Sequence, residues 1–134
     1  MTGILVFIAV LVFIAHACKG AADSLQFHFN RSFARDWGAQ FWNPAESWRN
    51  KYQDGDKTKG EKFPGSSTIF VAFTDGWHLL QTAQYLALRL ALTLAVTPVR
   101  VEAPGLADYA LTFAALWIVG AAGFTLTYKI LKVK

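Results

Sequence analysis

The chain has 134 residues, 54% of them hydrophobic, and its mean hydropathy is +0.29. This length leaves room for one domain, and a second, soluble catalytic domain does not fit beside so much apolar sequence. The single cysteine, Cys18, excludes an internal disulfide and any zinc site built from paired cysteines. The formal net charge of +4 is typical of a membrane protein that contacts anionic headgroups, so we expect no nucleic-acid partner.

Three long apolar runs predict an all-α integral membrane protein with three transmembrane helices. Interfacial amphipathic helices are expected in the loop between the first two. The predicted single membrane domain divides into span 1 at 3–18, an aromatic-rich interfacial loop at 19–66, span 2 at 67–97, a short external hairpin at 98–105, span 3 at 106–128 and a basic tail at 129–134.

The first run needs a comparison with a cleaved signal peptide. Ala15-His16-Ala17 has the small-x-small form of a cleavage site, and Cys18 follows it, as in a lipoprotein. No lysine or arginine precedes the run, whereas a signal peptide has a basic start. We therefore expect residues 3–18 to be retained as the first span, although sixteen residues are near the lower limit for crossing.

Basic residues predict the orientation. Eleven lysines and arginines lie in the 19–66 loop and the tail together, and Arg100 alone lies in the 98–105 hairpin. Basic residues concentrate on the cytoplasmic side of membrane proteins. The sequence thus predicts a multi-pass membrane protein with the N-terminus outside and with the long loop and C-terminus in the cytoplasm.

Span 2 carries two distinct faces. It is predicted to start at a Ser66 or Ser67 cap and to continue to Pro98, with Trp77 as an aromatic-belt residue. An intramembrane polar stripe at helical spacing comprises Asp75, His78, Thr82, Tyr85 and Arg89. A small-residue face for helix packing comprises Ala83, Ala87, Ala91 and Ala95. Neither face suits lipid tails well, so we expect neighbouring helices on both.

Span 3 adds a second smooth patch and a charge. Gly120 and Gly123 would allow another helix to approach closely. Asp108 lies near the start of span 3, within the expected axial reach of Arg89 on the antiparallel span 2. We predict an intramembrane Arg89–Asp108 pair; the alternative is that Arg89 extends to the outer headgroups.

The loop is rich in aromatic residues and is not expected to be disordered. Residues 31–42 predict an amphipathic surface helix, 45–52 predict a second short helix, and Asp54–Gly60 predicts a solvated turn. Headgroups or a partner protein would cover the aromatic side chains. The residues assigned to this interfacial or partner contact are Phe33, Trp37, Phe41, Trp42, Trp48, Tyr52 and Trp77.

Several metal-binding residue types are expected at one membrane depth, because span 1 ends on the side where span 2 begins. The ligand candidates are His16, Cys18, His28, Asp75 and His78. Such side chains bind zinc, copper or haem iron. No motif fixes their geometry, so no cofactor is predicted, and a membrane metal or haem protein stays an alternative.

The absence of a catalytic motif in the sequence argues against an enzyme. The two packing faces instead favour a small structural or accessory membrane subunit, which packs into a homo-oligomer or a larger membrane complex. Its expected partners are the lipid bilayer and other membrane subunits or itself. The alternative is a small oligomeric transporter or pore lined by the Asp75, His78 and Arg89 stripe.

Overall fold

The computed structural model describes the backbone of residues 2–131 and the side chains of residues 3–127. Within this part the chain is all-helical and has no strand, and only one isolated antiparallel bridge joins Tyr52 to Glu61. The helices are α1 (Thr2–His28), α2 (Ala39–Trp42), α3 (Pro44–Ser47), α4 (Gly76–Arg100) and α5 (Leu106–Leu131). The 3-10 turns are η1 (Phe29–Arg31), η2 (Trp48–Lys51), η3 (Gln53–Gly55), η4 (Lys57–Lys59) and η5 (Val71–Phe73).

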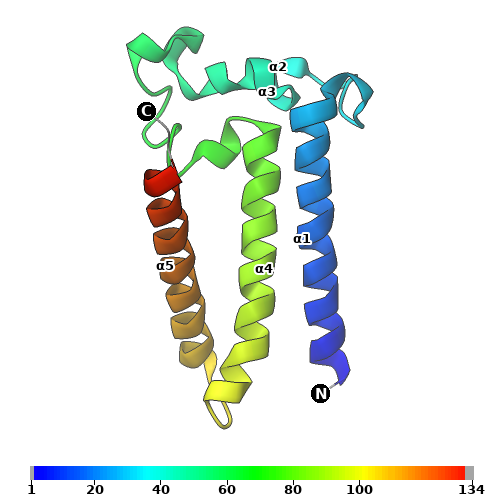
Figure 1. Cartoon of the computed structure of the whole chain (residues 1–134), viewed down its shortest axis with the longest axis vertical. Coiled ribbons are helices and arrows are strands. Elements are labelled where there is room, and N and C mark those ends of the chain that lie inside the picture. The colour runs from blue at the N-terminus through cyan, green and yellow to red at the C-terminus, as the bar shows by residue number, and fades with distance from the viewer. Residues whose placement is uncertain (1, 132–134) are drawn as a thin grey trace. The chain divides into compact units, whose positions relative to one another are not determined.

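Three helices, α1, α4 and α5, are long and apolar enough to cross a membrane, which confirms the predicted all-α class (Figure 1). The residues group into two compact units. One comprises Met1–Val12 with Ala87–Lys134, and the other is Phe13–Leu86. The second unit contains the whole loop between α1 and α4.

Helix α1 is longer than the predicted span 1. It continues ten residues past Cys18 and ends at His28. Lys19 and Asp23 form a salt bridge one turn apart in this extension, which stabilises the helix where its sequence turns polar. Hydropathy alone therefore located the lipid-compatible part of α1 and missed its polar last turns.

The predicted start of span 2 is wrong. Helix α4 begins at Gly76 and not at Ser66 or Ser67, because the preceding residues form turns and the 3-10 turn η5. Gly65 has φ +79°, a left-handed backbone conformation that interrupts a helix. The carboxylate of Glu61 accepts the N–H groups of Gly65 and Ser67, at 2.8 and 3.1 Å, and holds this turn in place.

The predicted end of span 2 is also too early. Helix α4 passes through Pro98 and ends at Arg100. Proline removes one backbone donor, so residue 98 makes no backbone hydrogen bond to the preceding turn. A short hairpin joins α4 to α5, which starts at Leu106 as predicted and reaches Leu131, three residues past the expected end (Figure 1).

The loop contains short helical turns in place of the predicted 31–42 helix. Ser32 has an extended backbone, and its hydroxyl accepts the N–H of Ala34 at 3.2 Å, which favours a turn over a helix. Helical structure resumes only after Gly38, in α2. The expected 45–52 helix is present as α3 followed by η2, and Asp54–Gly60 forms turns as predicted.

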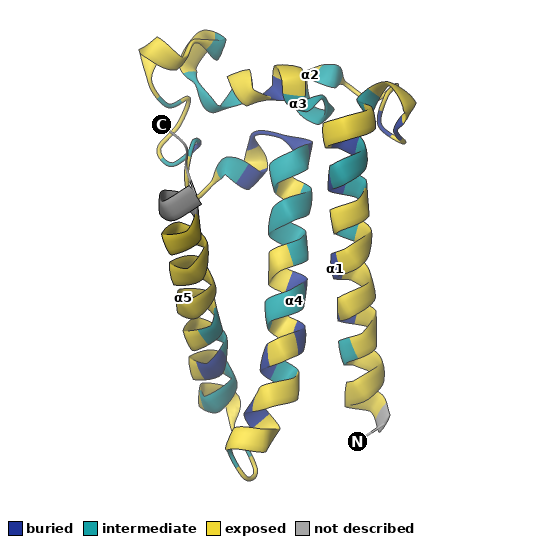
Figure 2. Cartoon of the chain, in the orientation of Figure 1, coloured by how far each residue is buried: buried dark blue, intermediate teal, exposed yellow. Residues whose placement is uncertain are grey.

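The buried apolar side chains are mostly alanines. Among the described residues, only Leu11 and Leu25 are larger; the others are Ala15, Ala22, Ala34, Ala72, Ala87 and Ala91. Large apolar side chains are exposed along α1 and α5, as Figure 2 shows for α5 in yellow. The described side chains thus form no large hydrophobic core, as expected when lipid or other helices cover the chain.

Candidate functional site

Asp75 caps the N-terminus of α4 from a buried position. Its Oδ1 accepts the backbone N–H of His78 at 2.8 Å, the usual bond of an N-cap side chain. The imidazole Nδ1 of His78 also lies 2.8 Å from both carboxylate oxygens of Asp75. The hydroxyl of Thr74 donates to Oδ2 at 3.2 Å. The carboxylate therefore organises both the backbone and the side chain of the first turn.

Lys51, from η2, completes this group. Its Nζ lies 3.5 Å from the Nε2 of His78. An ammonium can only donate, so the geometry fits an imidazole that carries its proton on Nδ1 and accepts at Nε2. Burial raises the pKa of Asp75, but the hydrogen bonds from the side chain and backbone of His78 and the charge of Lys51 outweigh it, so the net pKa is lower than usual.

The loop is fastened to this cluster by Asn50 and Trp42. The side-chain amide of Asn50 donates to the carbonyl oxygens of Thr74, at 2.8 Å, and Gln40, at 2.7 Å. The Trp42 ring lies against Gly76, where a β-carbon would approach ring atom Cε3 to 2.3 Å. We name residues 38–75 the cap. The start of α4 and the cap are thus one packed structure within the second unit.

Four of the predicted contact aromatics form one cluster. Trp42 makes edge contacts with Phe33, Trp37 and Phe41, at centroid distances of 6.1, 5.2 and 5.2 Å, and Phe33 lies 5.3 Å from Trp37. Phe33 and Trp37 remain exposed, at 48% and 51%. The cluster is therefore partly an internal packing element and partly open surface.

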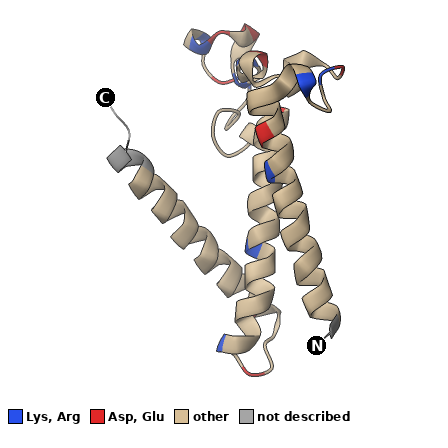
Figure 3. Ribbon diagram, turned by 45° about the vertical axis from the view of Figure 1, so that its right-hand side comes forward, with Lys and Arg blue, Asp and Glu red and all other residues tan. Residues whose placement is uncertain are grey.

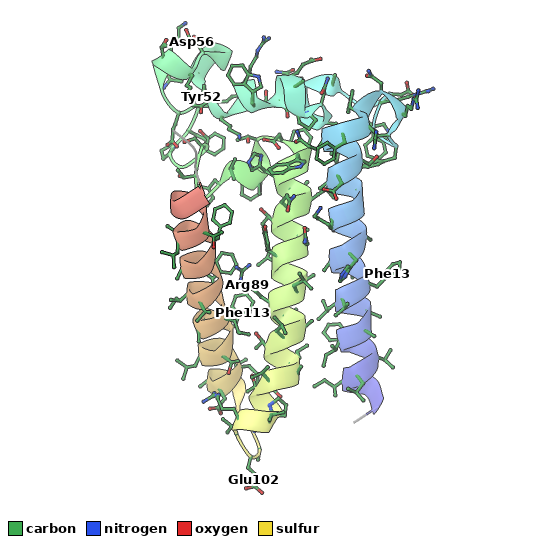
Figure 4. The ribbon with its side chains drawn as sticks, in the orientation of Figure 1. Phe13, Tyr52, Asp56, Arg89, Glu102 and Phe113 are labelled. Carbon is green, nitrogen blue, oxygen red and sulfur yellow. The ribbon has the colours of Figure 1, made fainter. Side chains whose placement is uncertain are left out.

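The remaining predicted aromatics lie in smaller groups. Trp48 and Tyr52 contact each other at 6.3 Å, and the guanidinium of Arg49 lies 5.6 Å from the Trp48 ring. Trp77 packs edge-on against the ring of His78 at 4.8 Å. Figure 4 shows Tyr52 in the cap. Trp48 is exposed, whereas Tyr52 and Trp77 are half-buried.

The polar stripe of α4 separates into two groups. Asp75 and His78 belong to the cluster with Lys51, and half-buried Thr82 and exposed Tyr85 follow along the helix. Arg89, a turn further on, lies in the other unit. Its guanidinium carbon is 4.4 Å from the Trp117 ring centroid on α5, a cation–π contact. Figure 4 shows Arg89 extending from α4 toward α5, near Phe113.

Gly120 provides the space for this arginine. A β-carbon at residue 120 would lie 2.8 Å from Nη2 of Arg89, whereas one at Gly123 would meet nothing within 4 Å. The two glycines, predicted as one packing patch, therefore differ. Gly120 accommodates a side chain of the same molecule, and Gly123 is open on α5.

The prediction that Arg89 pairs with Asp108 is wrong, because a different arginine pairs with Asp108. Asp108 pairs with Arg100, whose Nη2 lies 3.8 Å from Oδ1 and 3.2 Å from the Thr112 hydroxyl. Oδ2 of Asp108 also accepts the N–H of Gly105 at 3.0 Å, the reciprocal bond of a capping box at the start of α5. Arg100 is closer along the hairpin than Arg89, and Trp117 holds Arg89 instead.

The predicted alanine face of α4 is buried only in its middle. Ala87 and Ala91 are 8% and 3% exposed, Ala83 is half-buried and Ala95 is exposed. Thr93 and Thr97 are buried near them, and their hydroxyls donate to the carbonyl oxygens of Arg89 and Thr93, both at 2.7 Å. The small residues thus give close packing at the middle of the helix and not along its whole length.

The metal-ligand candidates do not form a complete set. Within residues 3–127, no three histidine, cysteine, aspartate or glutamate side chains lie close enough to hold a metal ion. Asp75 contacts His78, Cys18 is half-buried on α1, and His28 lines a cavity of about 560 Å³ at the end of α1. His16 lies on α1.

Sequence reasoning missed four residues that shape these sites: Asn50, Lys51, Gly76 and Trp117. Each acts through a contact with a residue distant in the chain. The string Thr74-Asp75-Gly76 held a usable signal, because an aspartate before a glycine and an apolar run is a good N-cap. Figure 3 shows that charged residues gather in the loop between α1 and α4, while the long helices carry few.

These features define a class of protein. It is all-helical in its described part, has three helices long and apolar enough to cross a membrane, and forms the cap from the segment between the first two of them. No family model matches the sequence, and neither a characterised protein nor a solved structure is significantly similar to it.

Proposed function

We propose that the protein is a small accessory membrane subunit that packs, as several copies or beside other chains, into a larger membrane assembly. The observation that carries the proposal is the exposure of α5. Every residue from Ala114 to Thr127 is exposed except Leu116, which is half-buried. This stretch includes Gly123 with open space around it, where a neighbouring helix could approach closely.

The cap adds support for an assembly role. Asn50 holds it by a bond to the Thr74 carbonyl oxygen and Trp42 by its contact with Gly76, and its exposed aromatic residues are Trp48, Phe63, Phe70 and Phe73. Rigid exposed aromatic residues are common at protein interfaces, because they bury a large area at little cost in conformational entropy.

We propose the predicted orientation, with the N-terminus outside and the cap and C-terminus in the cytoplasm. The distribution of basic residues supports it, since eleven lie in the loop and tail and Arg100 alone lies near the hairpin.

The transport alternative is less well supported by the contacts. Asp75 and His78 bond to each other and to Lys51, and Arg89 lies over Trp117. Polar groups that line a pathway need to face a water-filled space, and these side chains face protein.

Site-specific photo-crosslinking in native membranes tests the assembly role. A photoreactive residue at Ala122, in the exposed stretch of α5, should give a discrete protein adduct. The same residue at Leu5, 60% exposed on α1, is the control for contact with lipid. If Ala122 yields only lipid adducts at the level of Leu5, the proposed docking of α5 is wrong.

A further inference from the structure

We propose that the cap binds the headgroup of one anionic phospholipid in the cavity between α2 and the segment that leads into α4. The cavity has a volume of about 390 Å³, within the range of small-ligand sites. Its apolar wall comes from Phe41, Phe63 and Phe73, and its polar wall from Gln40, Asn50 and Lys62. All of these residues lie within the second unit.

Chain connectivity places this cavity at the membrane surface. Phe73 is three residues before Gly76, the first residue of a helix long and apolar enough to span. Three residues reach at most about 10 Å even when fully extended. The headgroup region is several ångströms deep on each side of the hydrocarbon core. Phe73 therefore lies at the level of lipid headgroups and upper acyl chains when α4 crosses the bilayer.

The exposure of this segment points to lipid as the occupant. Ile69 and Phe73 are 80% and 71% exposed, although they belong to an apolar stretch outside the spanning helix. Contact with water at this exposure is unfavourable for such large side chains. Acyl chains provide an apolar contact at the depth that the connectivity sets for Phe73.

The charge of the cavity selects an anionic headgroup. Lys62 lies at its edge, and in the described part of the chain its ammonium makes no salt bridge within 4.0 Å. The neighbouring carboxylate of Glu61 is engaged by Gly65 and Ser67. An ammonium next to amide groups and aromatic walls fits a phosphate with glycerol and acyl carbons attached.

The walls are held in place without a ligand. Asn50 bonds to Gln40 and Thr74, which joins two sides of the cavity. The N–H of Lys62 donates to the carbonyl oxygen of Lys51 at 2.9 Å, next to the Tyr52–Glu61 bridge. Such preorganisation lowers the entropic cost of binding.

Native mass spectrometry of the full chain in a nonionic detergent, titrated with phosphatidylglycerol or with phosphatidylcholine of the same chains, measures this binding. We expect one phosphatidylglycerol to bind at least about tenfold more tightly than phosphatidylcholine, and Lys62→Gln to remove that preference. Phe73→Ser should weaken binding of both lipids. Lys57→Gln, which removes an exposed charge of the cap outside the cavity, is the matched control and should leave the preference unchanged.

Two results would overturn the proposal. One is a preference for phosphatidylglycerol that Lys62→Gln leaves intact. The other is competition by glycerol 3-phosphate as effective as that by the whole lipid, which would assign the cavity to a soluble phosphate compound. All three substituted residues are exposed, so the variants should fold, and near-ultraviolet circular dichroism of the tryptophans verifies it.

Discussion

The ring of Trp42 occupies the space next to Gly76 that a β-carbon would need, with ring atom Cε3 2.3 Å from the ideal β-carbon position. Glycine at residue 76 thereby allows the cap to pack directly against the first turn of α4.

Gly76→Ala should detach or displace Trp42 from α4. Overpacking of this kind costs about 1–3 kcal/mol of unfolding free energy. Thermal unfolding in detergent and the tryptophan emission maximum should both change. Gly38→Ala is the matched control, because a β-carbon there meets no atom within 4 Å. Equal stability of the two variants would show that the contact with Trp42 is not needed.

Asp75→Asn should weaken the start of α4 but keep the N-cap hydrogen bond from the backbone N–H of His78. Asparagine caps helices as well as aspartate does, so the loss isolates the charge interaction with His78 and Lys51. Asp75→Ala also removes the N-cap hydrogen bond and should lower the free energy of unfolding by about 1 kcal/mol more. Thermal unfolding of both variants at neutral pH measures this. Unchanged stability of Asp75→Asn would contradict a separate contribution of the carboxylate charge.

Acid should remove the same contribution from the unsubstituted protein. The pKa of Asp75 is lowered in the folded state, so its contribution is present above the unfolded value of about 3.9 and declines as pH falls through the folded value. The pKa of Glu61 is lowered too, by bonds from Ser67 and Gly65. The unfolding temperature should therefore drop below about pH 4, and Asp75→Asn should drop less than the unsubstituted protein.

Arg89 and Trp117 should be energetically coupled. A double-mutant cycle with Arg89→Leu and Trp117→Leu in a lipid bilayer should give a coupling of about 1–2 kcal/mol, because an apolar medium excludes water from a cation–π contact. Gly120→Leu should disturb the same contact by crowding the guanidinium, whereas Gly123→Leu meets open space. Additive single variants would contradict the cation–π contact.

Asp108→Asn should change stability by less than about 1 kcal/mol. The side chains of Arg100 and Asp108 are 51% and 33% exposed, so solvent screens their 3.8 Å pair. Asparagine can still accept the N–H of Gly105. A loss of several kcal/mol on thermal unfolding would instead indicate that Asp108 is buried in a stronger interaction.

The sequence predicted features that depend on local chemistry. Three apolar runs predicted the helices that are long and apolar enough to cross a membrane, and the predicted start of span 3 at residue 106 is the start of α5. The sequence misplaced the start of α4, because both Ser66 and Asp75 are suitable N-cap residues. The choice between them depends on the turn that Glu61 holds around Gly65.

Contacts between distant residues were harder to predict. The depth of the residues along the helix axes suggested Asp108 as the partner of Arg89. In the structure, Arg89 instead faces Trp117 of α5. Lys51 and Asn50 gave no local signal of their contacts with His78 and Thr74. The regular spacing of aromatics at 31–42 indicated a helix, but the turn at Ser32 interrupts it.

Native mass spectrometry of the protein, extracted gently from its host membrane, tests the proposed assembly role most directly. It reports protein partners, copy number and bound lipid in one spectrum. We predict a complex with other membrane subunits or several copies of the chain. A monomer that carries only lipid, under conditions that preserve known membrane complexes from the same extract, would contradict the account.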